Sequence, residues 1–290
     1  MNRGLAKALG FTLPWSLTFF LVWLFPLIYA LMMGFTDYNL LRSDESQWVG
    51  FQNFSALFSD PDFLSAIKNT FVFVIGTIPA TTIMALVMAL LVNKSFKGRA
   101  VFRSAFFLPS ITSLVVIALI FTNLYQRGGY VAQLAAMVGL SVPEYGFLFD
   151  TGTALYSIMA MDVWMSAGYY MLIFLAGMKS IPDELYEAAE INGAGYFRKL
   201  FSITLPLLKP VALFILVINT IKSFQVFVEI FVMSKGKFDT MTMVYFIYEK
   251  GFTTTLQSGY ASAAAYVLFG IIAVFSILQF FVLRRKEPIW

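Results

Sequence analysis

The sequence predicts an all-α membrane protein with six transmembrane helices, and three observations lead to this fold class. Hydrophobic residues make up 59% of the 290 residues and charged residues only 12%, whereas soluble domains carry roughly 25% charged residues. Uncharged runs longer than the ~20 residues that cross a bilayer recur along the chain. Basic residues are also distributed unevenly among the segments between these runs. This composition excludes a soluble enzyme.

Six apolar segments account for the predicted helices, in chain order. Four contain no charged residue and lie between residues 7 and 37, 68 and 94, 103 and 127, and 250 and 284. Two more, about residues 153–178 and 207–233, are long enough to span but contain Asp162, and Lys222 with Glu229. The first segment exceeds the roughly 7–15 apolar residues of a signal peptide, so we expect it to remain in the mature protein.

Six spans place both termini on one side of the membrane, and the basic residues predict which side. Thirteen Lys and Arg residues fall on the side of the termini and six on the opposite side, with Lys222 inside a span. Because Lys and Arg are enriched in cytoplasmic segments, the N- and C-termini are predicted to be cytoplasmic.

The predicted helices divide the chain into three parts. Residues 1–65 hold the first helix and an outer loop, residues 66–283 form a core of five helices, and residues 284–290 are a cytoplasmic tail. Residues 36–69, 126–151 and 234–259 then face the outside and carry many acidic and aromatic residues. These segments either form a docking surface for a soluble partner or supply the aromatic belt of a membrane interface.

The chain contains no Cys and no His. Thiol nucleophiles, histidine bases, and metal sites built on thiolate or imidazole are therefore excluded. No basic stripe is long enough for nucleic acid. We expect no catalytic residue, no metal site, and no cofactor bound by this chain.

Residues 180–206, between the fourth and fifth spans, predict two short helices joined by a glycine turn. Ser180 is expected to cap the first helix, Pro182 suits its first turn, and Asp183 and Glu184 favour the positive end of its dipole. Gly193, after Asn192, is free to adopt a positive φ and end the helix.

The first of these short helices has a compact, partly apolar face with acidic residues beside it. Leu185, Ala188, Ala189 and Asn192 lie near one face at 3.6 residues per turn, while Glu187 points elsewhere. The small alanines allow another surface to approach closely. Two interpretations stay open: a surface for a cytoplasmic partner, or an amphipathic helix on the lipid headgroups.

This loop resembles the EAA loop of the permease subunits of binding-protein-dependent, type I ABC importers. The resemblance extends over about residues 48–281 and is similar to the carbohydrate branch. It is carried by Glu187-Ala188-Ala189, Asn192-Gly193-Ala194, Phe197, Ile203, Leu205-Pro206, Trp48-Val-Gly-Phe-Gln-Asn-Phe, Phe58-Ser-Asp-Pro, Phe102-Arg103, Phe107-Leu-Pro109, Leu175-Ala-Gly, Ile181-Pro182 and Gly259-Tyr-Ala-Ser-Ala.

The resemblance implies a permease of an ATP-driven importer in a bacterial or archaeal cytoplasmic membrane. Its partners would be a second, similar permease, two ATPase subunits and an extracytoplasmic binding protein that delivers a sugar; glycerol phosphate or another solute is the alternative substrate. The loop would couple to the ATPase through Glu187, Ala188, Ala189, Asn192 and Gly193. This chain has no Gly-x-x-x-x-Gly-Lys-Ser/Thr motif, so ATP and Mg²⁺ would bind the partner ATPases.

Two positions depart from the family pattern. Asn192 stands where the family most often has Asp, which removes a charge but keeps a residue that tolerates a turn. Lys235-Gly236-Lys237 follows the fifth span where related sugar permeases often read Gly-Gly-Pro. The second departure is expected to affect the outer gate or the docking of the binding protein.

Three ionisable residues inside predicted spans are candidates for the substrate path, because charges in a membrane are costly and face a cavity or a partner. Asp162 and Lys222 are expected near the midplane, and Glu229, seven residues after Lys222, on the same helix face. Asn219, Gln225 and Glu229 would donate or accept hydrogen bonds, and Trp164 or Tyr169 would stack on sugar rings. A structural Asp162–Lys222 pair without any ligand explains the charges equally well.

Two other classes of membrane protein fit the sequence less well than an importer. A membrane-embedded glycosyl transferase would use Asp162 or Glu229 as a catalytic carboxylate, but no second carboxylate or acidic metal motif accompanies them. An ion-coupled secondary transporter would explain the intramembrane charges, but it leaves the loop at 180–206 unexplained and predicts an internal repeat that is not visible.

Overall fold

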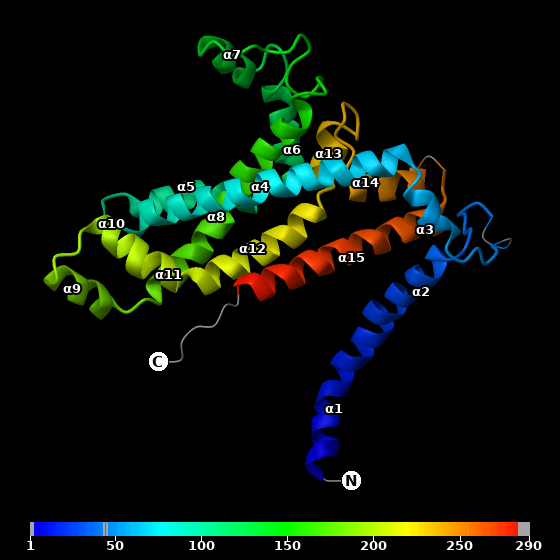
Figure 1. Cartoon of the computed structure of the whole chain (residues 1–290), viewed down its shortest axis with the longest axis horizontal. Coiled ribbons are helices and arrows are strands. Elements are labelled where there is room, and N and C mark those ends of the chain that lie inside the picture. Colours follow the sequence, from blue (N-terminus) through cyan, green and yellow to red (C-terminus); the bar gives the residue numbers. More distant parts are fainter. Residues whose placement is uncertain (1–2, 43, 45, 95, 254, 284–290) are drawn as a thin grey trace. The chain divides into compact units, whose positions relative to one another are not determined.

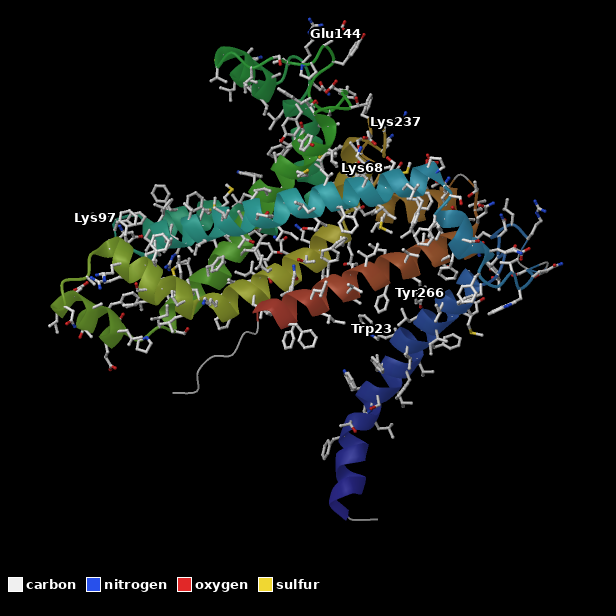
Figure 2. The ribbon with its side chains drawn as sticks, in the orientation of Figure 1. Trp23, Lys68, Lys97, Glu144, Lys237 and Tyr266 are labelled. Carbon is white, nitrogen blue, oxygen red and sulfur yellow. The ribbon has the colours of Figure 1, made fainter. Side chains whose placement is uncertain are left out.

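The computed structural model describes residues 3–283 without 43, 45, 95 and 254, and its regular elements in this part of the chain are all helices (Figure 1; with side chains, Figure 2). Within these residues, extended backbone pairs only at two isolated bridges, Thr36 with Trp48 and Gln126 with Gly146. The all-α class is therefore confirmed. The predicted tail at 284–290 lies outside the described residues.

The chain forms two compact units. The first runs to Leu64 and resumes over Phe246–Phe269, and the second comprises Ser65–Tyr245 and resumes at Gly270. The helices of the first part of the chain are α1 (Arg3–Thr18), the π-helical η1 (Phe19–Leu24), α2 (Phe25–Gly34), α3 (Gln52–Leu57) and α4 (Pro61–Asn93). The last ones are α14 (Met243–Tyr248), the π-helical η4 (Glu249–Thr253) and α15 (Ser258–Leu283).

A proline accounts for the π-helical turn in the first long helix. Pro26 has no N–H to donate to the carbonyl of Val22, four residues back. Immediately before it, the N–H of Phe25 donates to the carbonyl of Phe20, five residues back, which is the π-helical pattern. The helix thus widens instead of breaking.

Within the first unit, Asp60 holds the start of α4. Its carboxylate accepts the backbone N–H of Asp62 at 2.9 Å, the usual bond of an N-cap. The same carboxylate accepts the Tyr260 hydroxyl at 3.0 Å and lies 3.6 Å from the Lys250 ammonium. Gly259 touches the Thr36 carbonyl, and a Cβ at that position would collide with it.

The second unit is organised around α8 (Ala154–Lys179), the most buried of the long apolar helices. It packs against α5 (Arg99–Ile111), α12 (Lys209–Phe224) and α13 (Val228–Met233). Gly168 lies so close to α5 that a Cβ would collide with the Phe106 carbonyl. The remaining elements are α6 (Leu114–Leu124), α7 (Tyr130–Met137), α9 (Asp183–Ile191), α10 (Tyr196–Lys199), the π-helical η3 (Leu200–Thr204) and α11 (Leu205–Leu207).

Five described helices are long and apolar enough to cross a membrane, and a bent pair is a sixth candidate. The five begin at Gly10, Pro61, Ala154, Lys209 and Ser258. The pair is α5 and α6, whose axes differ by 96°. The sequence predicts one helix between residues 103 and 127, but the backbone of Thr112 is extended at the break, three residues after Pro109. The run of apolar residues predicted the position of this segment but not its bend.

Candidate functional site

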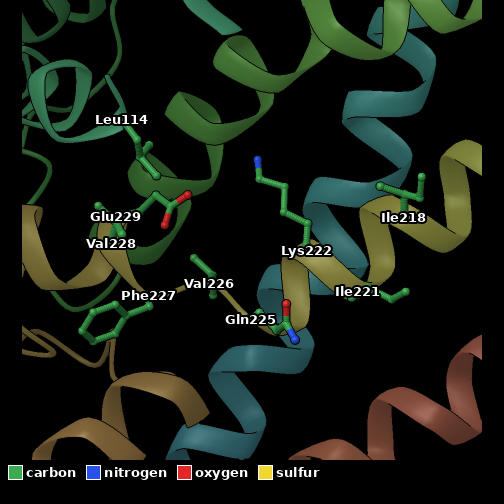
Figure 3. A pocket seen from close by; sticks show the side chains of 9 residues that line it. All are labelled: Leu114, Ile218, Ile221, Lys222, Gln225, Val226, Phe227, Val228 and Glu229. Atoms are coloured by element: carbon green, nitrogen blue, oxygen red, sulfur yellow. The ribbon is translucent and has the colours of Figure 1, made fainter. Parts of the chain in front are cut away.

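A pocket of about 480 Å³ lies where α12 gives way to α13 (Figure 3). Its polar groups come from Lys222, Gln225 and Glu229. The apolar lining is Leu114 of α6, Ile218 and Ile221 of α12, and Val226, Phe227 and Val228. An apolar hollow with a few polar groups is typical of a small-molecule site.

The pocket exists because the helix predicted over residues 207–233 is interrupted. The last turn of α12 closes with a bond from the Gln225 N–H to the Lys222 carbonyl at 3.0 Å. Phe227 then leaves helical geometry, with φ −142° and ψ −56°, and α13 restarts at Val228. Lys222 and Glu229 line the same pocket as expected, but the predicted reason, one continuous helix face, is wrong.

An ion pair lies behind the pocket. The Lys222 ammonium donates to Asp162 Oδ1 at 2.8 Å and to the Ser166 hydroxyl at 2.5 Å. Ser166 in turn donates to the same carboxylate oxygen at 3.2 Å. The Asp162 side chain is 2% exposed and that of Lys222 is 38% exposed. Lys222 therefore faces the pocket and Asp162 holds it from the protein side.

Ser166 was not identified from the sequence, although a signal was present. It lies four residues after Asp162 on α8, so the two side chains share a helix face. A hydroxyl at this spacing can satisfy part of a buried carboxylate. Polar residues at i+4 from an intramembrane charge are therefore worth including in a predicted site.

Glu229 is buried, at 4% exposure, and lines the pocket from the first turn of α13. Among the described residues no basic side chain lies within ion-pair distance of it. Asn219, by contrast, is fully buried and does not line the pocket. Its carbonyl oxygen accepts the Ser223 hydroxyl at 3.4 Å, and its amide nitrogen has no partner among the described residues.

The two aromatic residues predicted to stack on sugars lie outside this pocket. Trp164 is partly exposed on α8 and packs against Phe121, with ring centroids 5.3 Å apart. Tyr169 is also partly exposed and meets Tyr170 edge to face. The structure thus brings Asp162, Lys222, Gln225 and Glu229 together, and leaves Trp164 and Tyr169 apart from them.

The predicted glycine turn of the loop at 180–206 is present. Gly193 has φ +75°, and its N–H donates to the Glu190 carbonyl at 2.9 Å. The Ala194 N–H reaches back to the Ala189 carbonyl at 2.9 Å, which completes a Schellman motif at the end of α9. Asn192 adds a bond from its amide to the Ala188 carbonyl at 2.8 Å.

The predicted cap of that helix is wrong, although Asp183 and Glu184 lie in its first turn as expected. α8 continues to Lys179, and Ser180 follows its last turn, donating its hydroxyl to the Gly177 carbonyl at 2.8 Å. Pro182, with extended backbone, precedes α9 without any side-chain cap. Ser180 therefore ends one helix instead of beginning the next, because its hydroxyl finds a free carbonyl in α8.

The coupling residues predicted on α9 are accessible. Glu187, Ala188, Asn192 and Gly193 are exposed and Ala189 is half-buried. Large apolar side chains are exposed beside them, including Ile191 at 87% and Phe197 at 71%. Exposed apolar side chains grouped on a loop are typical of a contact surface.

Two contacts hold this loop together, and a third ties it to the rest of the second unit. The Tyr186 hydroxyl hydrogen-bonds the Thr204 hydroxyl at 3.0 Å, which joins α9 to η3, ahead of α12. Lys199 forms an ion pair with Glu190. Lys94, after α4, lies 4.5 Å from the centre of the Tyr196 ring. α9 is thus linked to α10 and η3, which follow it, and α10 contacts the residue after α4.

The sequence of residues 78–287 matches the family described as "Binding-protein-dependent transport system inner membrane component". The chain belongs to this family. Similar proteins of Bacillus subtilis (strain 168) include the probable ABC transporter permease protein YesP, 33% identical over 93% of this chain and 88% of YesP. The arabinooligosaccharides transport system permease protein AraP is 32% identical over 93% of this chain and 86% of AraP.

A solved structure is similar to this permease over its whole length. It is the crystal structure of a bacterial ABC transporter involved in the import of the acidic polysaccharide alginate, with a TM-score of 0.84 and 25% sequence identity. The match covers 99% of this chain and 100% of that chain. The family expected from the loop at 180–206 is confirmed, and the permease is a multi-pass membrane protein and a translocation subunit.

Proposed function

We propose that this permease is one of two membrane subunits of an ATP-driven importer that takes up a saccharide in a bacterial or archaeal cytoplasmic membrane. The observation that carries the proposal is that one unit holds both a pocket lined by polar groups and an exposed helix, α9, suited to a partner. The printed functions of AraP and of the alginate transporter support a saccharide as the substrate.

In this proposal the permease crosses the membrane six times. The bent pair of α5 and α6 acts as one crossing, which adds to the other five candidates. An even number places the N- and C-termini together, and the thirteen basic residues on their side make that side cytoplasmic. Residues 1–65 then form the first helix with its outer loop, 66–283 the core, and 284–290 a cytoplasmic tail.

The loop at 180–206 couples the permease to its ATPase partners. Glu187 faces basic residues of an ATPase subunit, Ala188 and Ala189 permit close approach, and Asn192 and Gly193 form the turn that presents α9. ATP and Mg²⁺ belong to the two ATPase subunits. The bond between Tyr186 and Thr204 would carry a displacement of α9 toward α12 and the pocket.

The pocket at the α12–α13 break is the proposed saccharide site. Gln225 and Glu229 bond hydroxyl groups, and Lys222 does so while Asp162 holds it in place. Asn219, Trp164 and Tyr169 belong to the proposed path outside this pocket. A binding protein supplies the saccharide at the outer segments. The permease alternates between an outward-open and an inward-open conformation, and each nucleotide state shifts this equilibrium by the difference between its affinities for the two conformations.

Purification of the tagged chain from its native membrane tests the proposal. We expect a second permease and an ATPase that contains the phosphate-binding motif to co-purify, and a soluble binding protein to join when sugar is added. Neighbouring reading frames that encode these partners would support the same conclusion. A chain that purifies alone and drives uptake with an ion gradient would contradict it.

A further inference from the structure

The fixed charges around the pocket are unbalanced. Three ionisable side chains contribute: Lys222 and Glu229, which line it, and Asp162, which pairs with Lys222. The other residues that line it are apolar apart from Gln225 (Figure 3). The described residues therefore supply one cation and two carboxylates.

The single cation is already neutralised. Asp162 is nearly fully buried and lies 2.8 Å from the Lys222 ammonium, and Ser166 satisfies a second donor of the same ammonium. An anion that bound Lys222 would compete with a buried carboxylate, which would then be left without its partner. Lys222 thus offers a hydrogen-bond donor to a ligand, but little net positive charge.

Glu229 contributes the charge that remains. It is 4% exposed and has no basic partner within ion-pair distance among the described residues. A like charge brought into this partly apolar, weakly screened space would be repelled, whereas a hydroxyl could donate to the carboxylate.

We propose that the pocket selects uncharged saccharides over saccharides that carry a carboxylate or phosphate, and that Glu229 determines this selection. The inference rests on the proposed function, since it assumes that the pocket takes a saccharide. It distinguishes this permease from the structurally similar transporter of the acidic polysaccharide alginate. It also disfavours a glycerol phosphate as the substrate.

Pairs of saccharides that differ in charge and only slightly in size provide the test. The probes are trigalacturonate and its fully methyl-esterified form, together with the corresponding acid and methyl ester of the glucuronate and mannuronate trisaccharides. Binding to the complete importer in nanodiscs is measured by calorimetry without the binding protein, whose own selectivity would otherwise be recorded. We expect the neutral member of a pair to bind about tenfold more tightly than the acid.

Two substitutions in the pocket move the selectivity in opposite directions. Glu229→Gln removes the unpaired charge and should reduce the preference to about twofold or less. Gln225→Glu adds a carboxylate at an exposed lining position and should increase the preference. Glu144→Gln removes an exposed carboxylate outside the pocket and should leave the preference for the neutral saccharide unchanged.

The outcomes separate the two claims. Equal or tighter binding of the acids by the unmodified importer would overturn the selection, as would a preference that neither Glu229→Gln nor Gln225→Glu alters. Binding of no saccharide, neutral or acidic, would instead contradict the proposed function, and the selection would fall with it.

Discussion

Asp162 and Lys222 are the two charged residues within predicted spans that form an ion pair in the structure. The sequence indicated that two charges within spans needed an explanation, because an isolated charge in a membrane is costly. It could not decide between a ligand and a partner, since pairing depends on how α8 and α12 pack. The structure shows the pair, and it also shows that Lys222 keeps one side toward the pocket.

Removing one member of this pair should destabilise the permease more than removing both. Asp162→Asn and Lys222→Met each leave the other group without its partner, and each should lower the free energy of unfolding by about 2 kcal/mol. This loss is smaller than for a fully buried pair because the Lys222 side chain is 38% exposed. The double variant should cost less than the sum. Thermal unfolding of the purified importer measures this, and strictly additive losses would contradict a direct pair.

The Tyr186 hydroxyl is the most specific link between α9 and the helix that leads to the pocket. Tyr186→Phe removes its bond to Thr204 and should cost about 1 kcal/mol of coupling. Sugar transported per ATP hydrolysed should therefore fall. Tyr196→Phe is the matched control, because it keeps the ring that Lys94 contacts. Equal effects of the two variants would argue against a role for the Tyr186 bond.

At the scale of elements, the sequence predicted positions well and interruptions poorly. The spans follow from apolar length, because a membrane requires an uninterrupted apolar helix wherever lipid surrounds it. The break at residues 225–227 carried no signal, since no Gly or Pro lies between Ser223 and Val228. It is a product of tertiary packing, as non-helical backbone at membrane depth is tolerated only where protein or a cavity surrounds it.

Local chemistry predicted the turn after α9 and the acidic first turn of that helix, but not the residue before it. Gly193 was identified because a positive φ favours glycine, and that requirement is purely local. Ser180 was misassigned because a hydroxyl can bond the helix before it or the helix after it. The length of α8 decides between them, and that length depends on packing.

Gly193 and Gly195 offer a direct comparison of backbone conformations on the loop. A Cβ would meet open space at both positions, but only Gly193 has a positive φ. Gly193→Ala should therefore strain the turn by about 1 kcal/mol and raise the ATP consumed per sugar transported. Gly195→Ala should behave like the unmodified protein. Identical behaviour of both variants would show that the turn is not required for coupling.

At the scale of the whole molecule, the absence of cysteine makes the proposed orientation easy to measure. Single cysteines can be introduced without background, for example Glu187→Cys on α9 and Glu144→Cys in the segment 126–151. Both positions are exposed. In intact cells a membrane-impermeant maleimide should label Glu144→Cys, and Glu187→Cys only after permeabilisation. The reverse pattern would contradict cytoplasmic termini.

In the proposed mechanism, saccharide import is driven by ATP through α9. Uptake of the neutral saccharide that binds most tightly should be measured in proteoliposomes that hold the complete importer and its binding protein. We expect uptake to require ATP and to fall more than about tenfold in Glu187→Ala, because an interfacial charge loses its partner. Glu184→Ala, also exposed on α9, should change uptake little. Uptake that proceeds without ATP, or that is unchanged in Glu187→Ala, would contradict the account.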